Sequence, residues 1–411
     1  LGLWCGNNEM EWAWVEWDVP QIPKLKTDYI KQFEVLLPEV VARLDPDRFY
    51  WPSSPSSGGG FDRPNDPDRG DVHYWEVWQG KAKIEDFRKH CFRFCSEFGF
   101  QSFPSMKTIR SFTEPEDRNI FTPVMESHQK CGYGNGMIMK HLADQYLYPK
   151  DLDSLLYVSQ LLQAEAVRGA VEHWRRNRGR CMGAIYWQLN DCWPVASWSG
   201  IDYFGRWKAL HYFAKRFFAP VLLSAKEDGK TVELHVSNET LDRAEGTVVW
   251  ALRDRNSRVL RSGSAMVAVD RLSSREAVRL DFTDDIATLD DLQSVYLEFE
   301  LLMAEKPVSG GTLIFVKPKH FRLQDPAISW EAEERDDAFA IRVVSTAYAK
   351  YVELDLMETD GWFSDNYFDL TAGVPKEILL PKHRMSRSMT LAELRSRLKV
   401  RSLFDSYVFQ D

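Results

Sequence analysis

The stretch TDYIKQFEVLLPEVVARLDPDRFYWP, residues 27–52, decides how the first half of the chain is interpreted. Its apolar residues recur at spacings of three and four between Ile30 and Leu44, which is the period of an amphipathic helix. The aromatic run Phe49–Trp51 is typical of a short strand, and Pro52 ends it. The stretch therefore predicts a helix over residues 27–44 and a strand over residues 48–51.

The same alternation continues to about residue 218. Further strands are expected at residues 72–75, 92–95 and 182–189, the last of them fully buried, and further helices at 84–90, 152–177 and 207–218. Strands that alternate with helices indicate a parallel sheet. The pattern favours a (β/α) barrel over an antiparallel sandwich for this part of the chain.

After Pro220 the pattern changes to short strands separated by turns. Seven candidates follow at a spacing of about ten residues: 221–223, 231–236, 246–252, 264–269, 277–282, 295–302 and 312–316. This spacing predicts an immunoglobulin-like sandwich. Five more candidates, at 328–332, 339–345, 351–358, 366–370 and 376–380, predict a second, smaller sandwich. We therefore expect three domains, at residues 1–218, 219–319 and 320–411.

Composition narrows the class of protein. The 411 residues are 44% hydrophobic and 27% charged, which is ordinary for a globular chain and argues against disorder. A net charge of −9 argues against a general nucleic-acid binder, and no apolar stretch reaches the length of a membrane span. Of 15 Trp residues, 12 precede residue 218. Aromatic rings suit sugar binding, although a core role is expected for most of them.

The six cysteines do not suggest a disulfide scaffold, and the sequence predicts no metal site. His90, Cys91 and Cys95 lie close together in the sequence, but no second Cys pair accompanies them. We interpret these cysteines as free thiols rather than as metal ligands.

Two glutamates each follow a predicted strand. Glu9 ends the segment Trp4-Cys5-Gly6-Asn7-Asn8-Glu9, and Glu97 lies in Cys95-Ser96-Glu97-Phe98-Gly99. In a barrel, the carboxyl ends of the strands meet at the catalytic face. Two carboxylates that converge there suggest glycoside hydrolysis, in which one is the proton donor and the other the nucleophile or base. A structural or surface role is the alternative for either one alone.

Several motifs resemble a known family. GNNE at residues 6–9 and SEFG at 96–99 resemble the acid/base and nucleophile segments of glycoside hydrolase family 2. Longer segments resemble its β-mannosidase branch: FYWPSSP at 49–55, GDVHYW at 70–75, YWQLNDCWP at 186–194 and WFSDNYF at 362–368. The resemblance implies the C-terminal part of a (β/α)8 TIM barrel followed by two immunoglobulin-like β-sandwiches.

The resemblance also implies a reaction. Glu97 is expected to be the nucleophile and Glu9 the acid/base of a retaining exo-β-mannosidase, with Asn8 hydrogen-bonded to the 2-hydroxyl of the sugar. At the start of the cycle Glu9 must be mostly protonated and Glu97 ionised. No cofactor is expected, and the implied partners are β-mannosides or manno-oligosaccharides.

The remaining implied site residues are aromatic or basic. Trp187 is expected to be a sugar platform. His73, Tyr74 and Trp75 are expected to line the pocket, with Tyr74 a candidate to hydrogen-bond the nucleophile. Trp17 contributes to the rim or, equally well, to the core.

The chain departs from the family pattern at its start. The resemblance implies upstream β-domains and the first barrel strands, so we expect a C-terminal fragment that begins within the fourth strand and lacks the N-terminal domains of its parent chain. Two alternatives stay open. One is another family 2 glycosidase, a β-galactosidase or β-glucuronidase, and the other is a non-catalytic carbohydrate-binding fragment. Turnover of aryl glycosides distinguishes them.

Overall fold

The computed structural model describes residues 1–80 and 82–409, and the chain divides into two compact units. Unit 1 comprises residues 1–99 and 173–187, and unit 2 comprises residues 100–172 and everything from residue 188 onward. This division does not follow the expected boundary at residue 218, and the three domain ranges stay predictions. Within the described ranges, no helix has both the length and the apolar character needed to cross a membrane.

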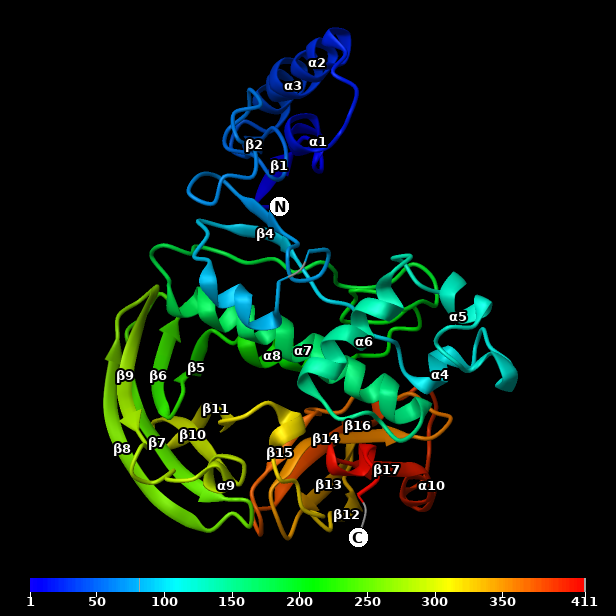
Figure 1. The fold of residues 1–411 in the computed structure, drawn as a ribbon, viewed down its shortest axis with the longest axis vertical. Helices are drawn as coiled ribbons and strands as arrows, with labels where there is room; N and C mark the ends of the chain where they lie inside the picture. Colours follow the sequence, from blue (N-terminus) through cyan, green and yellow to red (C-terminus); the bar gives the residue numbers. More distant parts are fainter. Residues whose placement is uncertain (81, 410–411) are drawn as a thin grey trace. The chain divides into compact units, whose positions relative to one another are not determined.

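Unit 1 contains two pairs of parallel strands (Figure 1). Strand β1 (Leu3–Cys5) pairs with β2 (Phe49–Trp51), and β3 (Val72–Tyr74) pairs with β4 (Cys95–Phe98). The strand expected at residues 92–95 therefore lies three residues later. Its ladder with β3 starts only where the Val72 amide donates to the Phe94 carbonyl, so the preceding apolar residues do not pair as a strand.

The helix expected at residues 27–44 changes its pitch along its length. It consists of α2 (Pro23–Tyr29), the π-helix η1 (Ile30–Leu36) and α3 (Leu37–Leu44). Pro38 has no N–H to donate to the carbonyl four residues before it. The Leu37 amide bonds to Gln32, five residues back, which is the π-helical spacing. Unit 1 also contains α1 (Met10–Glu16) and the 3₁₀-helix η2 (Ile84–Lys89).

The prediction of a fully buried strand at residues 182–189 is wrong. The segment runs beside β4, where Ile185 donates to Cys95 and Trp187 to Phe98, but only an isolated bridge between Ala184 and Cys95 forms. Ile185 is 57% exposed and Leu189 is 58% exposed. A continuous apolar run predicts burial on both faces, and these residues are buried on neither.

Most of the long helix α7, which was expected at residues 152–177, belongs to the helical part of unit 2. The helices are α4 (Met106–Ile109), α5 (Pro123–Ser127), α6 (Gly134–Gln145), α7 (Leu152–Arg176) and α8 (Ala209–Phe217). Apolar side chains lie on every side of the middle of α7, and Val158, Leu161 and Val167 are fully buried. Ser159, Gln160 and Gln163 of the same stretch are buried as well, so the middle of α7 is enclosed on all sides.

The seven strands expected after Pro220 are confirmed as strands of a two-sheet sandwich (Figure 1). One sheet has the order β11-β10-β7-β8 and the other β5-β6-β9. The strands are β5 (Val221–Asp228), β6 (Thr231–Asn238), β7 (Ala244–Asp254), β8 (Val259–Val269), β9 (Ser273–Asp281), β10 (Val295–Met303) and β11 (Lys306–Ile314). Residues that alternate along these strands, such as Val232 and Leu234, form the core between the sheets.

The second sandwich has one strand more than the five expected. Its sheets have the orders β12-β13-β16 and β15-β14-β17. The strands are β12 (Ser329–Glu334), β13 (Ala338–Val344), β14 (Ala349–Leu356), β15 (Phe368–Leu370), β16 (Lys376–Pro381) and β17 (Leu398–Arg401). Between the sheets lies a core that includes Phe339, Val352 and Leu380. Short helices α9 (Leu289–Leu292) and α10 (Leu391–Arg397) complete the two sandwiches.

Candidate active site

Unit 1 brings the two predicted glutamates together at the ring of His73. His73 Nδ1 lies 2.7 Å from Glu9 Oε1 and 3.6 Å from Glu97 Oε2. A carboxylate oxygen from each glutamate and a ring nitrogen of His73 all lie within 4.8 Å of one another. The Glu9 side chain is 18% exposed, the Glu97 side chain 14% and the His73 side chain 1%. The site is therefore a pair of half-buried carboxylates that share one buried imidazole.

Glu9 is held by the backbone at the end of β1. It adopts φ 61°, in the left-handed region that non-glycine residues rarely adopt. Its amide donates to the Ser54 carbonyl at 2.8 Å, and its carbonyl accepts from Ala13 at 2.7 Å as α1 begins. The Asn7 side chain accepts from the Met10 amide at 3.1 Å. These bonds at both sides of the turn fix the direction of the Glu9 side chain, and backbone outliers of this kind cluster at functional sites.

His73 and Glu97 are direct neighbours in the β3–β4 ladder, which places their side chains on the same face of the strands. The Asn65 side chain holds the backbone of His73 on the other edge. It accepts from the His73 amide and donates to the His73 carbonyl, both at 3.0 Å. The position of the imidazole is thus set by main-chain bonds on both sides of its strand.

Burial raises the pKa of Glu97, because the charged form loses contact with water. The charge of His73 opposes this shift, Glu9 adds to it, and a hydrogen bond from the Trp75 side chain again opposes it. The predicted pocket residue Trp75 therefore contacts the Glu97 carboxylate.

Tyr74 does not lie at the pair, which corrects the expectation that it lines the pocket and bonds the nucleophile. Side chains alternate along a strand, and Tyr74 points away from the face used by His73. Its ring packs at centroid distances of 4.9 Å from His90, 5.3 Å from Phe92 and 5.7 Å from Phe87. Burial in this aromatic cluster raises the pKa of Tyr74 to about 12.

The other predicted sugar contacts lie near the ends of the same elements. Asn8 is half-buried beside Glu9 and forms an isolated bridge with Ser54. Trp187 is 43% exposed and lies in the segment that runs beside β4. Trp17 is 45% exposed, and its ring meets that of Trp12 edge-on at 5.5 Å.

The sequence did not single out Trp12, Ser54 or Asp71, which all surround His73. The ring of Trp12 meets His73 edge-on at 6.3 Å. Ser54 Oγ lies 2.9 Å from His73 Nε2 and donates to Asp71 at 2.6 Å. A helical spacing of three residues from Glu9 was the available signal for Trp12. The other two residues lie inside the segments 49–55 and 70–75, but nothing in those segments indicates that they meet.

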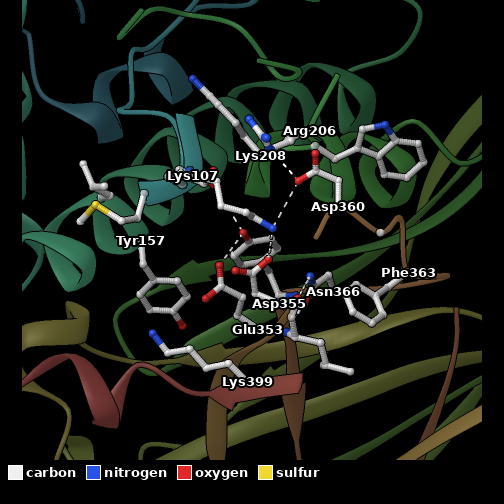
Figure 2. Close-up of a pocket in the computed structure, with 18 of the residues that line it drawn as sticks. Lys107, Tyr157, Arg206, Lys208, Glu353, Asp355, Asp360, Phe363, Asn366 and Lys399 are labelled. Atoms are coloured by element: carbon white, nitrogen blue, oxygen red, sulfur yellow. Dashed lines mark hydrogen bonds and ion pairs between the residues drawn. The ribbon is translucent and has the colours of Figure 1, made fainter. Parts of the chain in front are cut away.

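Unit 2 contains a cavity of about 450 Å³ that is lined by ion pairs (Figure 2). Lys107 Nζ lies 2.8 Å from Asp355 and 3.4 Å from Asp360. Arg206 Nε lies 2.6 Å from the same Asp360. Since these cations are already paired with carboxylates, we interpret the cavity as an ion-pair cluster within unit 2 and not as a sugar site.

One group on the first sandwich has the residue types of a metal site. Ligand atoms of Glu233, His235 and Glu276 lie within 4.8 Å of one another. Glu233, however, is paired with Arg279 at 2.7 Å and with Lys226 at 3.1 Å. These cations compete with a metal ion for the carboxylate.

Comparison with known proteins identifies similar chains. Residues 230–320 match the family described as a mannosidase Ig/CBM-like domain, and residues 323–406 match an Ig-fold domain family of mannosidases. The β-mannosidase of Capra hircus is 28% identical over 98% of this chain and 49% of its own length. The β-mannosidase B of Neosartorya fischeri is 37% identical over 55% of this chain and 28% of its own length. The solved structure of a β-D-mannosidase from Dictyoglomus thermophilum matches 98% of this chain with a TM-score of 0.87 at 28% identity.

The resemblance to β-mannosidases is confirmed. It extends over nearly the whole chain and includes both sandwiches as Ig/CBM-like domains. The chain spans about half the length of the relatives, 49% of the Capra hircus protein and 48% of the Dictyoglomus thermophilum chain.

Proposed function

We propose that this chain supplies the catalytic pair of a retaining exo-β-mannosidase, with Glu97 as the nucleophile and Glu9 as the acid/base. The observation that carries this proposal is the approach of Glu9 and Glu97 to within 4.8 Å across His73. Carboxyl groups about 5 to 5.5 Å apart belong to retaining glycosidases, whereas inverting pairs are about 6.5 to 9.5 Å apart and leave room for a water. The names of the relatives favour a β-mannoside as the substrate.

In the first step, a carboxylate oxygen of Glu97 attacks the anomeric carbon. The bond from that carbon to the leaving oxygen breaks, and the leaving oxygen takes a proton from Glu9. The products are a covalent glycosyl ester on Glu97, a free aglycone and an ionised Glu9. The hydrogen bond from Trp75 and the charge of His73 support this step, because both favour the ionised Glu97 that must attack.

In the second step, Glu9 takes a proton from a water whose oxygen attacks the same carbon. The ester bond to Glu97 breaks and the sugar leaves with its configuration retained. Both glutamates return to their starting protonation states. Asn8 next to Glu9 and the half-exposed ring of Trp187 are the proposed sugar contacts, through a hydrogen bond and ring stacking respectively.

The fold proposal accompanies the chemistry. We infer that the parallel pairs β1–β2 and β3–β4, with the segment that follows α7, are part of a (β/α)8 barrel. Glu9 lies in the turn between β1 and α1, and Glu97 lies in β4. This agrees with the rule that barrel enzymes place catalytic groups at the carboxyl ends of the strands.

The test uses the full-length protein and aryl β-mannosides. Glu97→Ala is expected to abolish turnover of every substrate. Glu9→Ala is expected to lose about 10² to 10⁴-fold with a poor leaving group. With dinitrophenolate, which leaves without a proton, the covalent intermediate should accumulate, and azide should restore turnover to a β-configured mannosyl azide. Glu39→Ala, an exposed residue of α3, is the control that should behave like wild type.

Two results would contradict the proposal. Azide rescue of Glu97→Ala to the β-configured azide, with Glu9→Ala rescued only to the inverted azide, would exchange the two roles, because azide that replaces a missing nucleophile inverts the configuration. Faster hydrolysis of aryl β-galactosides or β-glucuronides than of the mannoside by wild type would keep the pair but replace the substrate.

A further inference from the structure

Behind Glu9 and Glu97 lies the buried carboxylate of Asp71, which is the acceptor in each of its hydrogen bonds. Asp71 Oδ1 accepts from the Trp51 indole at 2.8 Å and from the Ser56 amide at 3.0 Å. Its Oδ2 accepts from the hydroxyls of Ser54 and Ser96. An ionised carboxylate only accepts hydrogen bonds. These four donors therefore describe an ionised Asp71 that uses the hydroxyl protons of both serines.

This arrangement of donors determines whether His73 Nε2 donates or accepts a hydrogen bond. Ser54 has a single hydroxyl proton, and we assign it to the bond with Asp71, because that contact is 2.6 Å long whereas the alternative contact with Ser96 Oγ is 3.2 Å long. His73 Nε2 lies 2.9 Å from the same hydroxyl oxygen, which is left as an acceptor. Nε2 must therefore carry a proton and donate it to Ser54.

The other side of the ring faces the glutamates. Nδ1 lies 2.7 Å from Glu9 Oε1, a distance that requires a proton between the two atoms. In the second step Glu9 is a carboxylate, so that proton must belong to Nδ1, and the ring then carries protons on both nitrogens. We propose that Asp71 and Ser54 are positioning residues that hold His73 as an imidazolium between the two glutamates throughout the cycle. This inference rests on the function proposed above.

A fixed imidazolium matches the way in which negative charge moves during the reaction. The charge starts on Glu97, 3.6 Å from Nδ1, and passes to Glu9, 2.7 Å from it, when Glu97 becomes an ester. The ring thus faces one carboxylate at each stage. Because Nδ1 already donates to Glu9 Oε1, the proton that Glu9 gives to the leaving oxygen must be bound to Oε2.

The charged groups around His73 come from three places. Glu9 faces the ring from the β1–α1 turn and Glu97 from β4, while Asp71 acts through Ser54. Glu11 of α1 is also buried, but it accepts from Ser56 at 2.7 Å and from the Phe61 amide at 2.7 Å and makes no bond to the ring. Glu11 is therefore a matched control for a buried carboxylate in the same region.

The test is the pH dependence of kcat/KM of the full-length protein carrying Asp71→Asn. The new side-chain amide keeps an oxygen that accepts hydrogen bonds at the Oδ1 position. At the Oδ2 position its N–H groups face Ser54, whose hydroxyl can then turn and donate to His73 Nε2. His73 becomes a neutral imidazole that still donates to Glu9. With the positive charge gone, both limbs of the profile should move to higher pH, the acidic limb by about one unit or more, since a neighbouring opposite charge lowers a carboxyl pKa by about 1 to 3 units.

Three further variants keep the inference falsifiable. Glu11→Gln should lower stability and leave both limbs in place. Ser54→Ala should move the limbs in the same direction as Asp71→Asn, and Ser54→Thr, which keeps the hydroxyl, should restore them. Limbs that stay at their wild-type positions in both Asp71→Asn and Ser54→Ala would overturn the inference. Failure of the azide experiment above would instead overturn the roles of Glu9 and Glu97, so the two failures are distinguishable.

Discussion

The Trp75 indole N–H is one of two groups that favour the charged form of Glu97, the other being His73. A hydrogen bond to an ionised group stabilises it by about 1.5 to 3 kcal/mol. Trp75→Phe removes that bond and keeps most of the ring. We expect the pKa of Glu97 to rise further, so that the acidic limb of kcat/KM moves up by about one pH unit and activity at low pH falls.

The matched control for this change is Trp4→Phe in the same unit. The Trp4 indole donates to Asp45 at 3.0 Å and not to either glutamate of the pair. Its profile should coincide with that of wild type. An unchanged acidic limb in Trp75→Phe would show that the indole contributes shape and not charge stabilisation.

At the same scale, the sequence located the two glutamates but not all of their neighbours. Glu9, Glu97 and His73 follow from motifs, and the structure brings them together. The prediction for Tyr74 was wrong because the motif does not show which side chains of β3 face the two glutamates. A shift of one residue along a strand moves a side chain to the other face. The Asp71–Ser54 contact joins residues from two segments that are not paired as strands, and only the folded chain brings their side chains within 2.6 Å.

At the scale of the elements, Gly6 decides how closely β1 approaches β2. A Cβ at this position would lie 2.4 Å from the Pro52 carbonyl oxygen and 2.5 Å from the Tyr50 hydroxyl. Gly6→Ala is therefore expected to push the strands apart, at a cost of about 1 to 3 kcal/mol in the free energy of unfolding. Because Glu9 follows three residues later, kcat should fall as well.

Thermal unfolding and kcat measure this effect, and Gly2→Ala is the control because a Cβ there meets no atom within 4 Å. If both alanine variants unfold at the wild-type temperature, β1 has room that the structure does not show.

Elements were predictable where the local period is clear, as in the helical region 23–44. The segment 182–189 failed because an apolar run does not reveal how many neighbouring strands flank it.

At the scale of the whole molecule, the strands of the two sandwiches were predictable because alternation and turns are local signals. The contacts that join the sandwiches were not, since they link residues far apart in the sequence. Tyr296 of the first sandwich stacks on Tyr348 of the second at 3.9 Å. Asp369 on β15 also reaches across, where it accepts from Thr312 of β11.

Asp369 is a buried carboxylate with a full set of donors. Besides Thr312, it accepts from the Tyr351 amide at 2.8 Å and from Tyr348 at 3.2 Å, and it pairs with Lys350 at 3.3 Å. Burial opposes its charge, but Lys350 and the hydrogen bonds from Thr312 and Tyr351 hold the pKa of Asp369 below its usual value. The charged form therefore stabilises the folded state.

Asp369→Asn is expected to lower the free energy of unfolding by about 3 to 5 kcal/mol at neutral pH, because it leaves Lys350 buried without its partner. The pKa of an aspartate in the unfolded chain is about 4. Since the folded value is lower, unfolding takes up a proton in acid, and the stabilisation is complete above about pH 4 and declines as pH falls through the folded value. Denaturant titrations from pH 7 downward should therefore show the difference in free energy of unfolding between wild type and variant narrowing below about pH 4. The exposed Asp284→Asn on the first sandwich should match wild type throughout. A constant gap between Asp369→Asn and wild type down to the lowest pH would mean that packing, and not the charge of Asp369, joins the two sandwiches.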